Sequence, residues 1–181
     1  MALPKVLILP SVRYLRACFE YDQCSGMLRW KHRPRSHFVS SKEWKRWNAR
    51  FAGTVAGHKQ RHCRITMTTG NYVAHRIVWK MVTGKEPPPN IDHKNGDGYD
   101  NSWANLRVAD QTKQNWNRRI PKSNASGHKG VSRDHNSWKA TISVNKKPRH
   151  LGCFSSADDA AAAYNAAARE LHGEFYREAR L

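Results

Sequence analysis

A short stretch near the middle of the chain concentrates residues that could do acid–base and metal chemistry. It reads IDHKNGDGYDNSWANLRVADQTKQNWNRR and carries the adjacent pair Asp92 and His93. A neutral imidazole near pH 7 can take a proton from water, whereas carboxylate and amide oxygens suit a hard cation such as Mg²⁺. Asn105 follows thirteen residues after Asp92, and three more side-chain amides come nine to twelve residues beyond it: Gln114, Asn115 and Asn117.

These residue types match the needs of phosphodiester hydrolysis. A general base must take a proton from water, a cation must neutralise charge on the phosphate, and the leaving oxygen must be stabilised. We expect the Asp–His pair at the end of a strand, followed by a glycine-bearing turn. From Asp110 to Arg119 the pattern predicts a helix, with Asp110 or Thr112 as its N-cap. A hairpin followed by this helix could bring Asp92 and the amides together.

The same segment resembles the HNH endonucleases, especially the small freestanding and intron-borne enzymes of phages. The resemblance implies the ββα-metal fold, a β-hairpin plus a helix around one metal ion. It also implies that His93 is the general base and that Asp92 binds the metal. Asn105 matches the middle asparagine of the family, which holds the loop and positions the histidine.

The last position of the family motif, a histidine or an asparagine, does not align cleanly. It falls on Gln114 by ungapped spacing, on Asn115 with a shift of one residue, and on Asn117 one helical turn further on. The resemblance therefore implies one divalent ion, with Mg²⁺ first and Mn²⁺ or Zn²⁺ as alternatives. We expect Asp92 and an amide oxygen of Gln114 or Asn115 as its protein ligands.

The resemblance extends upstream, through FAGTVAG and YVAHRIVWKMVTGKEPP. Residues 51–79 are expected to form short strands with a hairpin turn at Thr69-Gly70-Asn71, and three prolines, Pro87 to Pro89, end the pattern. His75 and Arg76 are candidates for a phosphate or active-site contact, and Arg118 is a further candidate for DNA binding. The alternative for His75 is a hairpin histidine that is satisfied by the backbone.

A second small module follows a segment rich in Pro, Ser, Asn and Gly. Three short strands are expected, with turns near Asn136 and Asn145-Lys146, and then an alanine-rich helix that Ser156 caps and Gly173 ends. This module resembles the plant ethylene-response-factor type DNA-binding domain, whose three-stranded sheet packs on one helix and enters the major groove. The resemblance implies DNA contacts from several side chains: Lys129, Arg133, Trp138, Lys139, Arg149 and His150.

Two serines of this module stand where the plant domains commonly carry arginine. These are Ser132 and Ser143. Arginine can read guanine through two parallel hydrogen bonds, whereas serine cannot. The specificity of the plant proteins is therefore not carried over, and we expect phosphate contacts to set the register on DNA.

The expected fold class is α+β, with a ββα-metal HNH module preceded by short β-strands. This module is linked to a three-stranded antiparallel sheet packed on one helix. The expected segments are a basic N-terminal segment at 1–50, the nuclease module at 51–120, a linker at 121–127 and the DNA-binding module at 128–181.

Charge favours a polyanionic partner. The 181 residues include 32 Lys and Arg against 14 Asp and Glu, a net charge of +18, and each neutralised phosphate releases condensed counterions. Eleven Lys or Arg and a single acid, Glu43, lie between Arg29 and Arg64, interleaved with aromatic residues. Such a stretch suits a surface that follows a phosphate backbone. The alternative is a solvated face that covers a small aromatic core.

The four cysteines form no C-x-x-C pair, which argues against a zinc ribbon and for reduced thiols in a cytoplasmic setting. The apolar start, MALPKVLILP, is too short for a signal peptide, and no run reaches the roughly 18 apolar residues of a membrane span. We therefore expect no membrane partner and a cytoplasmic location, in the bacterial host cell if a phage encodes the chain.

The sequence thus predicts a metal-dependent endonuclease that cuts duplex DNA, by nicking or by double-strand cleavage, as a monomer or a homodimer. The resemblance suggests a homing-type role. One alternative is a non-catalytic DNA-binding transcriptional regulator, which would share the charge and the C-terminal module. Another is an RNA-processing nuclease, although the major groove of A-form RNA is too narrow for a sheet to read.

Overall fold

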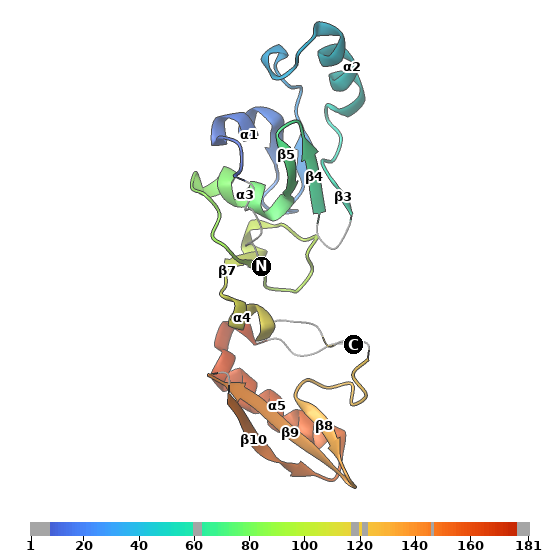
Figure 1. The fold of residues 1–181 in the computed structure, drawn as a ribbon, viewed down its shortest axis with the longest axis vertical. Helices are drawn as coiled ribbons and strands as arrows, with labels where there is room; N and C mark the ends of the chain where they lie inside the picture. Colours follow the sequence, from blue (N-terminus) through green and yellow to red (C-terminus); the bar gives the residue numbers. More distant parts are fainter. Residues whose placement is uncertain (1–7, 60–62, 117–119, 121–122, 146, 177–181) are drawn as a thin grey trace, which may run out of the picture. The chain divides into compact units, whose positions relative to one another are not determined.

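A computed structural model describes residues 8–59, 63–116, 120, 123–145 and 147–176. The chain divides into two compact units, Met1–Val108 and Ala109–Leu181. Each unit has its own small sheets and helices (Figure 1). The expected division of the chain into a basic N-terminal segment, a nuclease module, a linker at 121–127 and a DNA-binding module stays a prediction.

Among its described residues, the first unit contains three α-helices, two single-turn 3-10 helices (Arg35–His37 and Trp103–Asn105) and three small antiparallel sheets. The sheets are β1 with β2, then β3-β4-β5, then β6 with β7. In chain order the elements are α1 (Val12–Cys18), β1 (Phe19–Tyr21), β2 (Leu28–Trp30), α2 (Ser41–Phe51), β3 (His58–Lys59), β4 (Cys63–Met67), β5 (Gly70–Val73), α3 (Ala74–Thr83), β6 (Ile91–His93) and β7 (Leu106–Val108).

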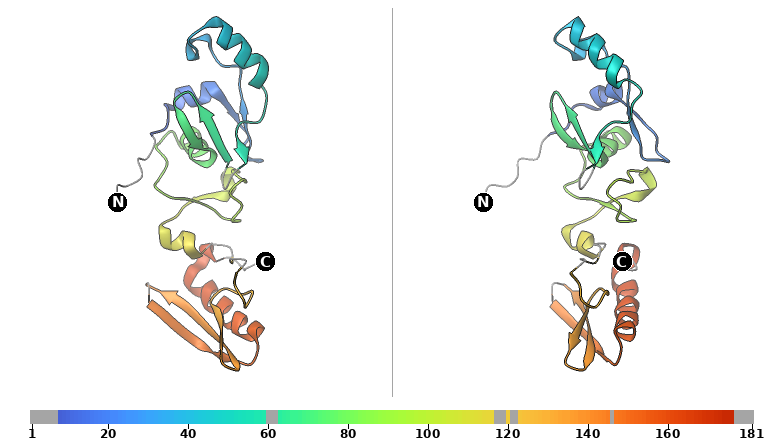
Figure 2. Two further views of the ribbon diagram at one scale, coloured as in Figure 1. Left: turned by 45° about the vertical axis from the view of Figure 1, so that its right-hand side comes forward. Right: turned by 90° about the vertical axis from the view of Figure 1, so that its right-hand side faces the viewer.

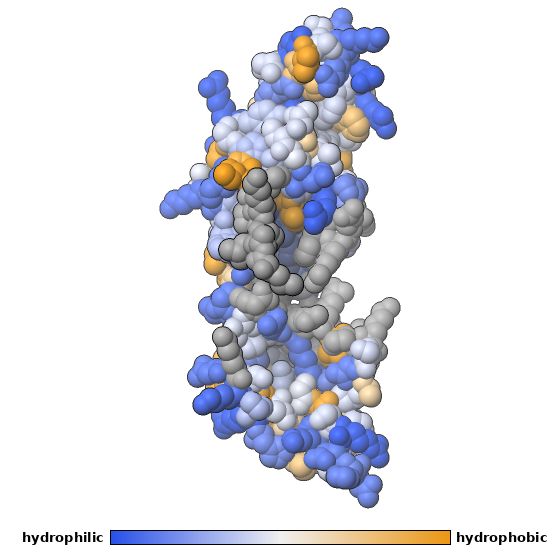
Figure 3. Space-filling model, viewed as in Figure 1, coloured by the Kyte–Doolittle hydropathy of each residue, from blue (hydrophilic) through white to orange (hydrophobic). Residues whose placement is uncertain are grey.

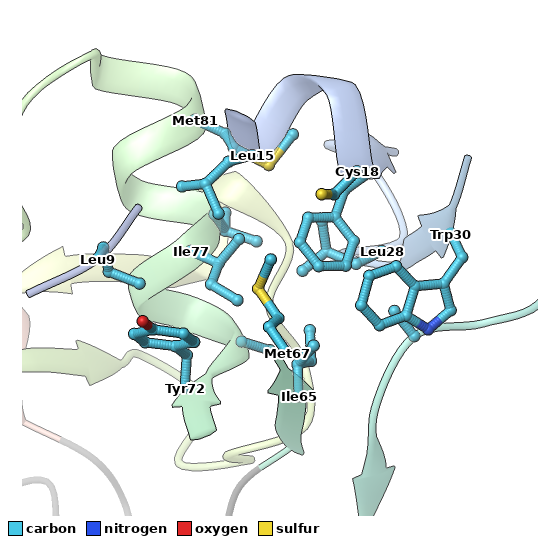
Figure 4. Packing of buried hydrophobic residues seen from close by; sticks show 14 of the residues in the cluster. Leu9, Leu15, Cys18, Leu28, Trp30, Ile65, Met67, Tyr72, Ile77 and Met81 are labelled. Carbon is cyan, nitrogen blue, oxygen red and sulfur yellow. The ribbon is translucent and has the colours of Figure 1, made fainter. Parts of the chain in front are cut away.

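The core of this unit lies between α1, α3 and the inner faces of β2 and β4. Leu15 of α1 and Ile77 of α3 are fully buried, and Met81 and Leu28 pack beside them (Figure 4). On β4, Ile65 and Met67 are buried whereas Arg64 and Thr66 are exposed, which is the alternation of a half-covered strand. The core therefore fixes α3 and the hairpins around one apolar centre.

The sequence prediction of strands through residue 79 is wrong, because residues 74–83 form helix α3. The buried residues of this segment are spaced as one face of a helix, at Ala74, Ile77, Val78 and Met81. Gly84 ends the helix in the left-handed conformation, with φ of 73°. The expected hairpin is present as β4 and β5, but its turn lies at Thr68-Thr69 instead of Thr69-Gly70-Asn71, because Gly70 already pairs with Met67 at the start of β5.

Helix α2 was not expected, and buried polar bonds attach it to the unit. The Asn48 side chain accepts from the Arg33 backbone N–H at 2.8 Å and donates to the Arg33 carbonyl at 3.1 Å. The Trp44 indole donates to the same carbonyl at 2.8 Å. The Arg33 side chain is 2% exposed, and its guanidinium lies 4.8 Å from the Trp47 ring centroid. The inner face of α2 is therefore used for attachment, and most of the tryptophans here belong to the core.

The second unit has the expected order of three strands and a long helix. Its elements are α4 (Gln111–Trp116), β8 (Val131–Asp134), β9 (Ser137–Val144), β10 (Lys147–Phe154) and α5 (Ala157–His172). The antiparallel sheet has the order β10-β9-β8, and α5 covers one face, as the views in Figure 2 show. Small side chains allow the close approach, since Ala160 and Ala161 pack on Val131 and Ala140.

Local contacts explain the ends of the helices in this unit. Ser156 caps α5 by accepting from the Asp159 N–H at 3.1 Å, as expected. Asp110 rather than Thr112 caps α4, accepting from the Lys113 N–H at 2.8 Å. The Trp116 ring stacks on His172 with centroids 4.2 Å apart, which places α4 against the end of α5.

Among the helices that the structure describes, none has the length and the apolar character needed to cross a membrane.

We predict that Asn48→Ala lowers the free energy of unfolding by about 1–3 kcal/mol, because the Arg33 peptide groups lose buried hydrogen-bond partners. Urea denaturation measures this change. Ala49→Ser on the exposed face of α2 is the control and should stay within about 0.5 kcal/mol of the parent. Equal stability of the Asn48→Ala protein and the parent would contradict the attachment described above.

Candidate active site

The Asp–His pair lies on a short β-hairpin in the first unit. β6 pairs with β7 so that Asp92 is opposite Arg107 and His93 is opposite Leu106. Two backbone bonds extend this pairing into the connecting loop: the Lys94 N–H donates to the Asn105 carbonyl at 2.8 Å, and the Gly96 N–H donates to the His93 carbonyl at 2.8 Å. The predicted strand end and glycine-bearing turn are therefore present.

The His93 ring is buried and held by an asparagine of the loop. Its exposure is 6%, and its Nε2 lies 3.1 Å from Oδ1 of Asn101, which is 4% exposed. The Nδ2 group of Asn101 donates to the Tyr99 carbonyl at 3.2 Å, so the amide oxygen faces the imidazole. His93 Nε2 therefore carries the proton of this bond. In a neutral imidazole, Nδ1 is then the nitrogen that can accept a proton.

A second histidine lies beside the first. The rings of His75 and His93 meet edge to face, with centroids 5.1 Å apart and planes at 79°. His75 is half-buried in the first turn of α3. The structure thus brings His75 next to His93, although on a helix instead of the expected strand.

Asn105 holds the loop in shape. Its Oδ1 accepts from the Asn95 N–H at 2.9 Å, and its Nδ2 donates to the Asp100 carbonyl at 2.7 Å and to Asn95 Oδ1 at 3.0 Å. The two ends of the loop are therefore tied through one buried amide. This geometry agrees with the loop-holding role that the sequence resemblance implies, and a contribution of Asn105 to catalysis stays a prediction.

The carboxylate of Asp100 lies close to this network. It accepts from the Ser102 N–H at 3.0 Å and from Asn95 Nδ2 at 2.7 Å. A hydrogen bond from the Ser102 side chain is the main cause that lowers the pKa of Asp100, and the backbone bond from Ser102, the bond from Asn95 and the interaction with His93 lower it further. Asp100 is therefore ionised at neutral pH and places negative charge near the imidazole.

Asp92 forms an ion pair with Arg107 across the hairpin. Nε and one terminal nitrogen of Arg107 donate to Asp92 Oδ2, at 3.0 and 2.9 Å. The side chains are 9% and 12% exposed for Arg107 and Asp92. A charge with so little exposure needs a partner, and Arg107 supplies one that also fixes the Asp92 side chain on the hairpin.

The hairpin of β1 and β2 supports the loop from outside. The Tyr21 hydroxyl donates to the Asn101 carbonyl at 2.8 Å, and the Trp103 N–H donates to the Gln23 carbonyl at 3.0 Å. Gly26 has φ of +72°, and a Cβ there would come within 2.2 Å of the Ser102 nitrogen. Burial raises the pKa of Tyr21 to about 12, with nearby Asp22 adding to the rise, so the phenol stays a donor at neutral pH.

Asn101, Arg107 and Tyr21 were not predicted from the sequence. Arg107 could have been found from the hairpin register, because it lies directly opposite Asp92. Asn101 carried only a weak signal, as one of several polar residues in the loop. Tyr21 carried none, because its hydrogen bond spans 80 residues of sequence.

The amides predicted to complete the metal site lie on or next to α4, in the second unit. Asn115 is exposed on this helix. Gln114 is also on the helix, with its side chain outside the described residues, and Asn117 and Arg118 lie outside them as well. Pairing of Asp92 with one of these amides therefore stays a prediction.

Arg76 has partners inside the first unit. Its guanidinium donates to the carbonyls of Pro87, Pro88 and Pro89 at 3.3, 2.8 and 3.3 Å. Burial lowers the pKa of this arginine, and Glu86 opposes the change. Arg76 thus fixes the proline segment that leads into β6, and its predicted contact with DNA stays a prediction.

The carboxylate of Asp92 offers oxygen atoms, which suit a hard divalent ion, although its Oδ2 also accepts the two hydrogen bonds from Arg107. Within the described ranges, no group of three or more His, Cys, Asp or Glu is placed to hold a metal. A metal bound at Asp92 would therefore take its other ligands from amide oxygens, from water or from a phosphate. This donor set fits Mg²⁺ better than a thiolate-rich structural zinc site.

The side chains predicted to contact DNA in the second unit are divided between the two faces of the sheet. Direct cross-strand partners share a face, and neighbours in a strand alternate. Ala140 packs in the core under α5, so Lys139 and its partner Ser132 project from the uncovered face. Trp138 lies on the covered side, where it packs against that core. Thr141, opposite His150, also lies on the uncovered face.

The remaining members of the predicted set have other surroundings. Arg133 pairs with Trp138, and its guanidinium lies 5.3 Å from the Trp138 ring centroid. Arg149 is exposed and pairs with Ile142. Lys129 Nζ donates to the Trp116 carbonyl at 2.6 Å, so this ammonium group helps to hold α4. Contact of any of them with DNA stays a prediction.

Comparison with known proteins agrees with this geometry. A family profile described as HNH endonuclease matches residues 72–115, which include α3 and the hairpin of Asp92 and His93. Protein 3.8 of Escherichia phage T7 is 35% identical over 106 residues, which cover 57% of this chain and 87% of that protein. An uncharacterized HNH endonuclease of Acanthamoeba polyphaga mimivirus is 29% identical over 114 residues, covering 61% of this chain and 59% of that protein. No solved structure gives a significant match.

We predict that Asn101→Leu lowers the free energy of unfolding by about 1–3 kcal/mol, because a buried imidazole N–H loses its acceptor. It should also reduce the fraction of His93 that carries its proton on Nε2, which nitrogen NMR of the imidazole ring measures. Asn101→Gln, which keeps an amide, should retain more of this tautomer. An unchanged tautomer ratio in the Asn101→Leu protein would show that the asparagine does not orient His93.

Proposed function

Since this chain belongs to the HNH endonuclease family and is therefore a phosphodiester hydrolase, we propose that it is a metal-dependent endonuclease of duplex DNA. HNH nucleases generally use a divalent metal, and the family implies DNA as the substrate. The observation that carries the proposal is the hydrogen bond between His93 Nε2 and Asn101 Oδ1. With the proton of a neutral imidazole on Nε2, Nδ1 is the nitrogen that can accept a proton as a general base.

The proposed reaction begins with proton transfer to His93. Nδ1 takes a proton from the attacking water as the water oxygen bonds to phosphorus. The resulting imidazolium keeps its Nε2–H bond to Asn101 Oδ1, and the ionised Asp100 stabilises the new positive charge. The phosphorus–oxygen bond to the leaving group then breaks, and the leaving oxygen takes a proton from solvent.

We assign the protein side of the metal site to Asp92 and an amide oxygen of Gln114 or Asn115. A divalent ion bound there would neutralise phosphate charge and stabilise the leaving oxygen. Arg107 holds the Asp92 carboxylate in place on the hairpin. Mg²⁺ is the proposed ion in the cell, because the donor atoms are oxygens.

The second unit is proposed to dock the enzyme on duplex DNA. Its three-stranded sheet has one face that α5 leaves uncovered, with Lys139 projecting from it and Thr141 beside it. A sheet of this kind fits the B-form major groove, which also favours DNA over duplex RNA. A homing-type role is the biological setting that the resemblance to phage enzymes suggests. With one active site per chain, the proposed enzyme either nicks one strand or cleaves both. It acts as a monomer or as a homodimer.

The alternative function is a DNA-binding regulator without nuclease activity. It would account for the net charge of +18 and for the C-terminal module. It would leave unexplained why a buried histidine held by Asn101 directly follows a carboxylate that is fixed by an ion pair within one hairpin. The geometry of the first unit therefore favours the enzyme.

We predict that His93→Ala reduces the rate of plasmid cleavage by about 10²–10⁴-fold with Mg²⁺ or Mn²⁺, because the general base is lost. Binding of uncleaved duplex should change little. His32→Ala, at an exposed histidine of the same unit, is the control and should cleave like the parent. Cleavage by the His93→Ala protein at the parental rate would exclude His93 as the base, and a parent that binds but never cleaves would favour the regulator.

We predict that Lys139→Glu weakens binding of duplex DNA by roughly tenfold, because a charge on the uncovered sheet face is reversed. Fluorescence anisotropy with a labelled duplex measures this change. Arg169→Glu on the exposed side of α5 has the same charge change and should have a smaller effect. If both variants lose the same affinity, the uncovered face is not the docking face.

A further inference from the structure

One face of helix α2 presents a row of basic side chains to solvent. Lys42, Lys45, Arg46 and Arg50 are all exposed and follow the spacing of neighbours on one side of a helix. Ala49, also exposed, completes this row. We call these four basic side chains the α2 basic face. Hydrophilic residues also dominate the surface around α2 on the side shown in Figure 3.

The α2 basic face is held firmly, because the opposite face of the helix is anchored. Asn48 and Trp44 bind the backbone of Arg33, as described above. Trp47 packs edge to face on Trp30, with ring centroids 5.0 Å apart, and also contacts Phe51. The four charges therefore project from a fixed support, so a partner would not have to order the helix on binding.

The charges of this face have little local compensation. In the part of the chain that the structure describes, none of the four forms an ion pair with an acid. Glu43 is the single acid of the helix, and it lies in the first turn, where the helix dipole favours it. Like charges three and four residues apart destabilise a helix by about 0.2–0.5 kcal/mol per pair. A solvated face normally mixes both signs, which this one does not.

A groove adjoins the last turn of the helix. It has a volume of about 540 Å³ and is lined by aromatic residues together with Arg50 and His58. Trp47 and Phe51 form part of its wall. The basic surface therefore continues from the helix into a hollow that can accept part of an extended, negatively charged chain.

We propose that the α2 basic face binds the phosphate backbone of the duplex that the enzyme cleaves, an inference that rests on the proposed function. The row from Lys42 to Arg50 spans about 12 Å at the helical rise. Duplex DNA carries one charge per roughly 1.7 Å of its axis, so several phosphates lie within reach. In Figures 1 and 2, α2 lies at the end of the unit away from β7, so it contacts DNA that flanks the cleavage point.

The test is the salt dependence of duplex binding by the full-length K42Q/R46Q variant. Each lost phosphate contact lowers the slope of log affinity against log salt by about 0.9, so the double variant should lose about 1.8. The maximal cleavage rate at saturating DNA should stay at the parental value, because neither residue is near His93. The control is R13Q/K85Q, which removes the same charge from exposed positions of the same unit. A second variant, K42R/R46K, keeps both charges and should keep the parental slope.

The outcomes separate this inference from the proposed function. Failure of the parent to bind or cleave duplex DNA would overturn the proposed function. A parent that cleaves, with a K42Q/R46Q slope equal to the parental slope, would overturn only the role of the α2 basic face. Equal losses in K42Q/R46Q and R13Q/K85Q would overturn it as well, since net charge alone would then matter. A lower slope of K42Q/R46Q with duplex RNA, together with a parental slope with duplex DNA, would also overturn the proposal, because the α2 basic face would then bind another partner.

Discussion

The geometry of this protein's active site depends on one hydrogen bond, between the buried imidazole of His93 and the side chain of Asn101. A loop of twelve residues separates the two strands of the hairpin, and such a loop has many conformations to lose on folding. Asn105 restricts it from within by tying Asn95 to Asp100. Tyr21 and Gly26 restrict it from outside, through contacts with Asn101 and Ser102. The N-terminal hairpin, which lies outside the residues 72–115 matched by the family profile, is therefore part of the scaffold of His93, the proposed general base.

In the first unit, the little-exposed charged side chains of the hairpin have partners, whereas the basic side chains of α2 lie in solvent. Asp92 and Arg107 are buried together, because either charge alone would be costly to remove from water. Asp100 is stabilised as an anion by hydrogen bonds from the loop, and it lies close enough to His93 for the two charges to interact. The basic residues of α2 remain in solvent at the far end of the unit, where a polyanion can reach them. The charged residues of the proposed active site and those of the α2 basic face thus lie in different parts of one unit.

Much of the site could be predicted from residue types and spacing, and the missing parts depend on contacts distant in sequence. The pair Asp92-His93 and the loop asparagine at 105 were visible because the motif is local. Helix α3 was missed because its β-branched residues and the alternation before it favoured a strand, whereas burial at 74, 77, 78 and 81 stabilises a helix. Tyr21 could not be found, since no local pattern indicates a partner 80 residues away. In the C-terminal module the strands were predictable, but the division of Lys139 and Trp138 between faces depends on the pairing register.

The His93 imidazole, held through Nε2 by Asn101, is proposed to be the base that activates water. Chemical rescue tests it most directly, by measuring plasmid cleavage of the His93→Gly protein with Mg²⁺ in the absence and presence of added imidazole. We expect very slow cleavage without imidazole and a rate that rises with its concentration, while the parent is unaffected. Cleavage at the parental rate by His93→Gly without imidazole would exclude His93 as the base.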